Sequence, residues 1–305
     1  MKEHMLSPET AKQTVNHMLS SEVARHIRRK QFDIPYSGGS QSQKLDIWYP
    51  NEEKEGPYPV ILFFHGGGFM HGGKGEDSSE PVLRGTDRGY VVVDCEYRKS
   101  RESRFPAMVY DAKAAIRFLK ANARRYQLDP DRIALWGPSS GGWLVSITAL
   151  TEGNPAFEDL SMGNGGYDCR VAAVIDWCGP CGGFLAMDEA FEHTKKGVPD
   201  HNLPDSPESV FLGSPLPEIP ELVRLANPCT YAHQAIPPFL IVHGTGDAVV
   251  PYEQSETFFR TLQQAAGPDK AELYTGDGAP HHGRNWWHEP WLSDLCFDFL
   301  DRNMG

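Results

Sequence analysis

Short apolar runs alternate with helical patterns along most of this chain. The run at 60–64, Val-Ile-Leu-Phe-Phe, is apolar at every position, as a strand buried on both faces should be. After Pro106, apolar residues recur at helical spacing as far as Ala123, which predicts an amphipathic helix. The other predicted strands cover residues 44–49, 90–94, 132–136, 171–177, 238–243 and 271–275, and the other predicted core helices 141–151, 252–266 and 290–303. Strands that alternate with helices form a doubly wound, mostly parallel sheet, so the predicted fold class is α/β.

Two segments depart from this alternation. Residues 7–29 precede the first strand and are predicted to be helical, because Ser7 and Pro8 provide a cap and a first position. Residues 178–236 contain many prolines and glycines and two short helical patches, which is typical of an inserted lid or cap. We therefore expect a helical segment within residues 1–30, a core made of residues 31–177 and 237–305, and a lid insertion at 178–236.

Charge and composition exclude several classes of partner. The formal net charge is -12 without a block of Lys and Arg, so neither a nucleic acid nor an anionic membrane is an expected partner. The first thirty residues hold no apolar stretch like a signal peptide, and no run of eighteen apolar residues occurs, so we expect a cytoplasmic protein. The six scattered cysteines are interpreted as reduced thiols. Nothing in the sequence indicates an oligomeric state.

A nucleophile motif lies between a predicted strand and a predicted helix. The sequence GPSSG at 137–141 fits the pattern GxSxG, in which glycines permit a tight turn that exposes the serine. This register selects Ser139, because choosing Ser140 would put Pro138 at the first glycine position. A glycine-rich turn whose serine only caps the next helix is the structural alternative. The position after a strand favours Ser139 as a nucleophile.

A second glycine motif, HGGGF at 65–69, follows the buried strand that ends at residue 64. Acyl transfer places negative charge on a carbonyl oxygen, and backbone N–H groups can be aimed at that oxygen where side chains are absent. Gly67, Gly68 and Ser140 are therefore the candidate oxyanion hole. The alternative is an ordinary flexible loop.

A serine nucleophile of this kind needs an acid and a histidine further along the chain. Asp247 lies just after the predicted strand 238–243 and is the candidate acid. His281 and His282 are adjacent in the loop after the last strand, and either could reach Ser139; His281 is our first choice and His282 the alternative. His65 and His243 close apolar strands, and we interpret them as structural histidines.

Four motifs together resemble the esterase/lipase branch of the α/β-hydrolases, and most of all the small esterases grouped with bacterial feruloyl and acetyl esterases, the BD-FAE-like group. They are HGGGF at 65–69, LDPDRIALWGPSSGG at 128–142, HGTGDAVVPYEQSE at 243–256 and GAPHHG at 278–283. Enzymes similar to hormone-sensitive lipase are more distant members of the same branch. The resemblance covers roughly residues 30–303 and implies the α/β-hydrolase fold.

The same resemblance implies a triad of Ser139, Asp247 and His281 and an oxyanion hole of Gly67, Gly68 and Ser140. It also implies hydrolysis of a small carboxylic ester, with acylated carbohydrates among the expected substrates, and no cofactor or metal. His282 stands where the family usually has glycine, so both histidines remain candidates for the base.

The string WCGPC at 177–181 matches a thioredoxin-type dithiol motif. Cys178 and Cys181 would then support thiol-disulfide exchange, in which the second thiol resolves a mixed disulfide. The related esterases tend to carry Trp-x-Gly-Pro at this point, so three of the five positions have an explanation outside redox chemistry. No second close pair of ligands follows, which argues against zinc.

Four residues are candidates for substrate contact. Phe69, His71 and Trp143 lie next to the oxyanion and nucleophile motifs, and Trp286 follows the histidine loop, where packing of the last helix is the alternative role. Three functions besides ester hydrolysis stay open: cleavage of amides, formamides or peptides by the same triad, a redox protein, and a noncatalytic binding protein.

Overall fold

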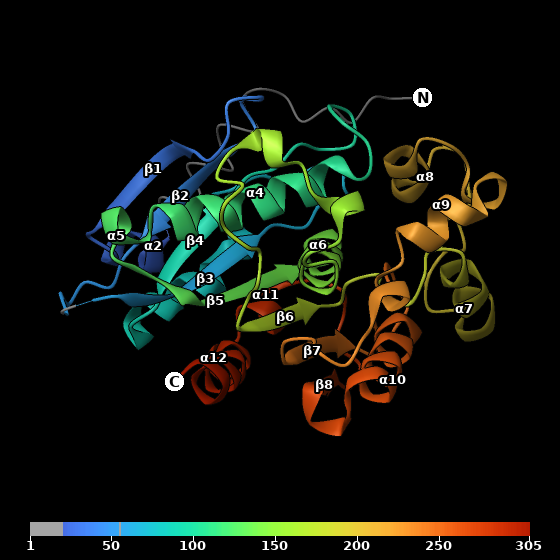
Figure 1. The fold of residues 1–305 in the computed structure, drawn as a ribbon. Coiled ribbons are helices and arrows are strands. Elements are labelled where there is room, and N and C mark those ends of the chain that lie inside the picture. Colours follow the sequence, from blue (N-terminus) through green and yellow to red (C-terminus); the bar gives the residue numbers. More distant parts are fainter. Residues whose placement is uncertain (1–20, 55) are drawn as a thin grey trace.

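The computed structural model describes residues 21–54 and 56–305 and contains an eight-stranded sheet in the order β1-β2-β4-β3-β5-β6-β7-β8 (Figure 1). β1 and β2 are antiparallel to their neighbours, and the pairs from β4 to β8 are parallel. The strands are β1 Lys30–Pro35, β2 Lys44–Trp48, β3 Tyr58–Phe64, β4 Val91–Cys95, β5 Leu128–Pro138, β6 Ala173–Trp177, β7 Phe239–Gly244 and β8 Ala271–Gly276. This sheet has the predicted α/β architecture.

Helices cover both faces of the sheet because successive side chains of a strand point to opposite sides. In β3, Val60 and Leu62 belong to one core cluster, and Ile61 and Phe63 belong to the other. The first cluster is completed by α4, α6 and α10 and the second by α2, α3, α11 and α12. The helices are α2 Glu22–His26, α3 Glu80–Leu83, α4 Ala107–Ala121, α5 Ala123–Tyr126, α6 Ser140–Leu150, α10 Glu253–Ala266, α11 Arg284–Trp287 and α12 Pro290–Met304.

The amino-terminal region differs from the prediction. Residues 7–20 of the expected helix lie outside the described residues, and in the described part a helix covers only Glu22–His26. The sequence also gave no sign of β1, which pairs antiparallel with β2 at the edge of the sheet. No residue of β1 is buried, so its composition lacks the apolar signal that marks the inner strands.

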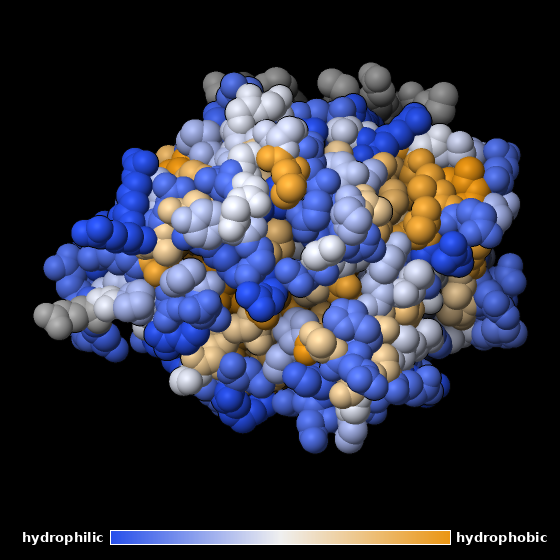
Figure 2. All heavy atoms as spheres, in the orientation of Figure 1, coloured by the Kyte–Doolittle hydropathy of each residue, from blue (hydrophilic) through white to orange (hydrophobic). Residues whose placement is uncertain are grey.

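The insertion at 178–236 lies between β6 and β7 and holds three α-helices, where two helical patches were expected. They are α7 Ala186–Thr194, α8 Pro207–Leu212 and α9 Pro220–Leu225. The surface seen in Figure 2 is largely hydrophilic, and hydrophobic residues gather over the end of the molecule that carries α8 and α9. Leu203 and Leu225 are among the exposed large apolar side chains of the insertion.

The predicted functional segments follow β3, β5, β7 and β8, which run parallel. The carboxyl ends of parallel strands meet at one edge of a sheet, where α/β proteins bind their ligands. The topology thus brings the motifs at 65–69, 137–141, 243–247 and 278–283 to the same edge. Within the two described ranges, none of the helices has the length and hydropathy to span a bilayer.

Candidate active site

Ser139 lies in a sharp turn between β5 and α6, with φ 55° and ψ −125°. A side chain is strained in this conformation, which is typical of a nucleophile elbow. The Ser139 N–H donates to the carbonyl of Trp177 over 2.7 Å, and Trp143 N–H donates to the Ser139 carbonyl over 3.0 Å. Gly141 permits the turn, because a Cβ there would collide with the carbonyl oxygen of Phe64 at the end of β3. The backbone therefore holds the serine at the amino end of α6.

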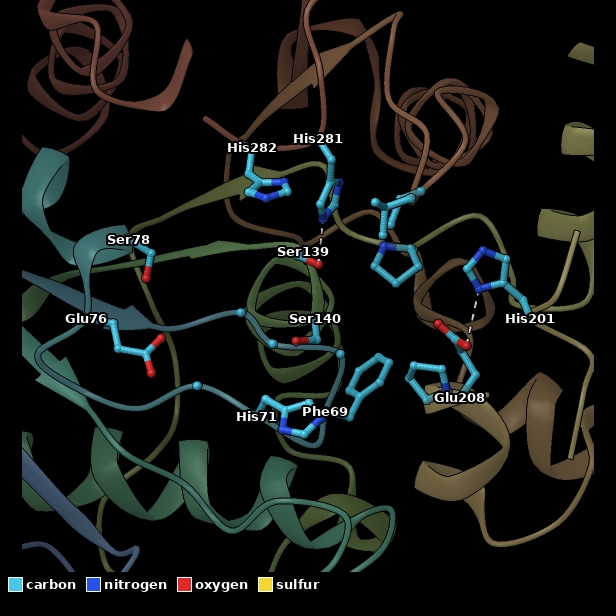
Figure 3. Close-up of a pocket in the computed structure, with 18 of the residues that line it drawn as sticks. Phe69, His71, Glu76, Ser78, Ser139, Ser140, His201, Glu208, His281 and His282 are labelled. Atoms are coloured by element: carbon cyan, nitrogen blue, oxygen red, sulfur yellow. Dashed lines mark hydrogen bonds and ion pairs between the residues drawn. The ribbon is translucent and has the colours of Figure 1, made fainter. Parts of the chain in front are cut away.

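His281 lies between Ser139 and Asp247. Its Nε2 is 3.0 Å from Ser139 Oγ, and its Nδ1 is 2.6 Å from Asp247 Oδ2 (Figure 3). Since a carboxylate only accepts, Nδ1 carries the proton and Nε2 is free to accept one from the serine. His282 lies next to His281, with ring centroids 6.0 Å apart, and within the described chain it makes no hydrogen bond to Ser139. Of the two adjacent histidines, the geometry favours His281 as the partner of Ser139.

Asp247 is buried and accepts four hydrogen bonds. The N–H groups of Val249 and Val250 each donate to Oδ1 over 2.8 Å, while His281 and His243 contact Oδ2 at 2.6 and 3.0 Å. Burial by itself would raise the pKa of Asp247, but the hydrogen bonds from His243 and His281 outweigh burial and hold the pKa well below its usual range. The carboxylate is therefore ionised and fixed in direction.

The glycine loop after β3 faces the serine. In the described part of the chain, the backbone N–H groups of Gly67, Gly68 and Ser140 donate no hydrogen bond to another protein group. Gly67 has φ 124°, and its carbonyl accepts from the N–H of His71 over 2.9 Å, which closes the loop. Ser100 holds the far end, donating to the Phe69 carbonyl from both N–H and hydroxyl over 2.9 Å. Three N–H groups are thus available to an oxyanion next to Ser139.

A cavity of about 560 Å³ opens above Ser139. The candidate contacts Phe69 and His71 line it, together with His281 and His282. The insertion adds His201 and Glu208, which the sequence analysis missed because this segment has no clear periodicity or motif. Glu76 and Ser78, from the loop before α3, were missed for the same reason and lie on the opposite side of Ser139 in Figure 3.

Two of the residues predicted to contact the substrate do not line the cavity. Trp143 does not line the cavity: its ring is buried behind Phe69, and its indole N–H donates to the Ala226 carbonyl over 2.8 Å. Trp286 points into the core, packing against Trp291, so the alternative role of packing the last helix applies. Its neighbour Trp287 lines the cavity instead.

Cys178 and Cys181 are buried free thiols. Burial raises the pKa of both well above the usual range, and the nearby carboxylates of Asp247 and Asp176 raise it further. Thiol exchange requires an accessible thiolate, so these surroundings oppose the redox interpretation. Cys178 Sγ lies 3.7 Å from the carbonyl oxygen of His281, which indicates a packing role beside the histidine loop.

Two clusters among the described residues place three metal-ligand atoms within 4.8 Å of one another. The first is Cys178, Asp247 and His281, where the acid and the histidine already bind each other and the thiol is held protonated. The second is Asp77, Glu80 and His288, next to which Arg284 contacts Asp77 Oδ1 at 2.6 Å. The Arg284 guanidinium already balances the charge of the acids in the second cluster. Because the ligand atoms of the first cluster are engaged with each other, neither cluster is arranged as a metal site.

Comparisons with known proteins give one matching family and several similar esterases. The BD-FAE family model matches residues 45–262. Esterase LipC of Mycobacterium tuberculosis is 29% identical over 241 residues, which are 78% of this chain and 56% of LipC. The chain spans about half the length of the curated relatives it matches.

Two solved structures are similar over most of the chain. A truncated carbohydrate esterase from gut microbiota is 28% identical with a TM-score of 0.75, covering 91% of this chain and 97% of its own. A bifunctional GH43-CE protein of Bacteroides eggerthii is 29% identical with a TM-score of 0.76, covering 90% of this chain and 35% of its own. With more than half of its length matched by the family model, the chain belongs to the BD-FAE family and has the α/β-hydrolase fold.

Proposed function

We propose that the chain is a serine carboxylesterase in which Ser139 is the nucleophile, His281 the base and Asp247 the acid that orients the base. The observation that carries this proposal is the continuous pair of hydrogen bonds from Asp247 through His281 to Ser139 at the floor of the cavity. The esterase relatives support the reaction class. The anionic Asp247 supports it further, because it stabilises the imidazolium that forms during the reaction.

The reaction proceeds in two acyl-transfer steps. His281 Nε2 takes the proton of Ser139 Oγ as that oxygen attacks the ester carbonyl, and the N–H groups of Gly67, Gly68 and Ser140 receive the oxyanion. His281 then gives the proton to the alcohol oxygen as the ester C–O bond breaks. The alcohol departs, and the acyl group remains on Ser139. Water, activated by the same histidine, releases the acid and restores the serine.

The proposed substrates are acetyl, other short-chain and hydroxycinnamoyl esters, including esters carried by carbohydrates. The cavity is of a size that suits small molecules, and the insertion forms part of its wall as a lid would. Turnover of acetyl, butyryl, octanoyl and feruloyl esters measures the acyl preference. An anilide and a formyl amide in the same series test the amide alternative, which predicts that these are cleaved at least as well as the esters.

Ser139→Ala tests the nucleophile. Hydrolysis of p-nitrophenyl acetate is expected to fall at least about a thousandfold, because the attacking oxygen is removed. Ser140→Ala is the matched neighbour and is expected to keep at least about a tenth of the activity, since Ser140 contributes only its backbone N–H. Full activity in Ser139→Ala, with both variants folded by circular dichroism, would contradict the proposal.

A parallel pair tests the base. His281→Ala is expected to lose at least about a thousandfold in kcat, and His282→Ala much less, because only His281 contacts both Ser139 and Asp247. The reverse order would assign the base to His282.

A further inference from the structure

His201 and Glu208 form a buried polar pair in the wall of the cavity that contains Ser139. His201 follows α7, Glu208 lies in the first turn of α8, and the two side chains are 9% and 7% exposed. His201 Nδ1 and Glu208 Oε2 are 3.3 Å apart as an ion pair. Neither atom has a well-aligned hydrogen bond within the part of the chain that the structure describes. Burying an ion pair whose charged atoms lack well-aligned hydrogen bonds is costly, so the position of this pair in a cavity wall requires an explanation.

The position of His201 is fixed by its surroundings. The N–H groups of His201 and Asn202 donate to the two carboxylate oxygens of Asp188 over 2.8 and 2.9 Å. The imidazole stacks on Phe191 with centroids 5.9 Å apart. Ser206 caps α8 by accepting from the N–H of Ser209, which fixes the turn that carries Glu208. The pair is therefore preorganised and not a chance surface contact.

The charges of the pair define the ligand that it fits. Burial lowers the pKa of His201, but Glu208 raises it more, and the net shift is upward, which favours the imidazolium. The charges of the two side chains then cancel, so the pair gives no net attraction to either an anionic or a cationic ligand. What remains is a donor beside an acceptor, which matches a hydroxyl group because a hydroxyl both donates and accepts.

We propose that His201 and Glu208 form a subsite for a hydroxyl group of the substrate, so that the enzyme prefers polyol or hydroxy-acid esters to plain alkyl esters. The inference rests on the proposed esterase function. Pro207 and Val249, which also line the cavity, would contact the carbon skeleton of such a substrate. The hydroxyl can lie on the alcohol or on the acid part of the ester, and the test distinguishes the two.

The test compares esters that differ only in hydroxyl groups. On the alcohol side the pair is 2,3-dihydroxypropyl acetate against propyl acetate, and on the acid side it is ethyl 3-hydroxybutyrate against ethyl butyrate. The wild-type enzyme is expected to favour the hydroxylated member of one pair by about tenfold or more in kcat/KM, because a plain ester cannot form hydrogen bonds with the buried pair. The pair that shows the preference identifies the side of the ester that meets the subsite.

Variants then connect the preference to these residues. Glu208→Leu and the double variant His201→Phe/Glu208→Leu are expected to reduce the preference to about threefold or less, and Glu208→Gln, which keeps a hydrogen-bonding head, is expected to retain part of it. A loss of folding lowers the rates of both esters equally and leaves their ratio unchanged, so the ratio separates the two effects. Glu189→Leu is the control, because Glu189 and His193 form a similar pair on α7 at 3.9 Å that is 76% and 78% exposed.

The control is expected to leave both the rates and the ratio unchanged. A wild-type enzyme that cleaves plain and hydroxylated esters equally, or a preference that survives in the double variant, would overturn the subsite. An enzyme that cleaves none of the four esters would overturn the proposed function itself.

Discussion

His243 contacts the same carboxylate oxygen of Asp247 as His281 does. Its Nε2 lies 3.0 Å from Asp247 Oδ2 and 3.1 Å from the Val250 carbonyl, while its Nδ1 lies 2.7 Å from Ser255 Oγ. Both neighbours of Nε2 are acceptors, so Nε2 carries the proton and Nδ1 accepts from the serine hydroxyl. His243 therefore donates to Asp247 through Nε2. The structural role expected from the sequence thus includes a direct contact with the proposed triad.

This contact predicts that His243 positions Asp247. His243→Phe, which keeps the ring but removes the donor, is expected to lower kcat about tenfold or more with a smaller change in KM. His243→Gln, whose amide can place an N–H near the position of Nε2, is expected to recover most of the loss. If the ring served only for packing, Phe would be the better replacement. A higher kcat in His243→Phe than in His243→Gln would therefore exclude a positioning role. Steady-state kinetics on p-nitrophenyl acetate measures both constants.

At the scale of elements, the site depends on how closely α6 approaches β3. A Cβ at Gly141 would collide with the carbonyl of Phe64 and lie 2.7 Å from that of His65. Phe64 ends β3, and the residues that follow it form the oxyanion loop. The approach thus sets the separation between Ser139 and the N–H groups that face it.

Gly141→Ala is therefore expected to lower both stability and activity. Overpacking of this kind costs about 1–3 kcal/mol, which corresponds to a fall in Tm of about 2–5 °C for a chain of this size. The esterase rate is expected to fall about tenfold or more, because the turn and the oxyanion loop move apart. Gly166→Ala, where a Cβ would meet nothing within 4 Å, is the control and is expected to change neither. Equal behaviour of the two variants in thermal melts and kinetics would contradict the close approach as the cause.

Elements with both faces buried are the ones that the sequence predicts well. β3 and β7 differ from their predicted bounds by two residues or fewer, because nearly every position of these strands is buried and most are apolar. β1 has no buried residue, and α8 and α9 have six residues each, so neither kind of element carries a readable period. The residues that follow the parallel strands, such as Ser139 and Asp247, could be predicted to lie close together because the carboxyl ends of these strands meet at one edge of the sheet. The position of His201 and Glu208 in the cavity wall depends on how the insertion packs against the rest of the chain, and no local sequence pattern encodes that packing.

At the scale of the whole molecule, two acids are fully buried beneath the edge that carries the site. Asp94 in β4 accepts from the N–H of Gly75 over 2.7 Å, and Asp176 in β6 accepts from the N–H of Gly179 over 2.8 Å. In both carboxylates, the second oxygen has no hydrogen bond within the described ranges. Burial raises the pKa of Asp94 to about 7 and that of Asp176 to about 6. The fold therefore retains protons that the unfolded chain releases.

The sign of this effect gives a prediction for Asp94. The folded chain keeps the proton of Asp94 up to a pKa of about 7, whereas the unfolded chain releases it near the ordinary aspartate pKa of 3.8, so this group makes the fold less stable as pH rises between those values. Asp94→Asn removes the ionisation and mimics the protonated acid in shape. The Tm of the variant relative to wild type is therefore expected to be higher at pH 8 than at pH 5, by about 3 °C or more.

Comparing the same variant at two pH values isolates the charge, because any packing cost of the amide is present at both. The exposed Asp131 supplies the control, since Asp131→Asn is expected to give the same small Tm difference at pH 5 and pH 8. Equal Tm differences for Asp94→Asn at the two pH values, measured by calorimetry in matched ionic strength, would mean that Asp94 ionises alike in the folded and unfolded chain. A destabilisation of the wild type that grows with pH would instead show that ionisation of the buried Asp94 lowers the stability of the fold. Asp94 binds the N–H of Gly75 in the loop after the oxyanion segment, so the acid that holds this loop would also limit stability at high pH.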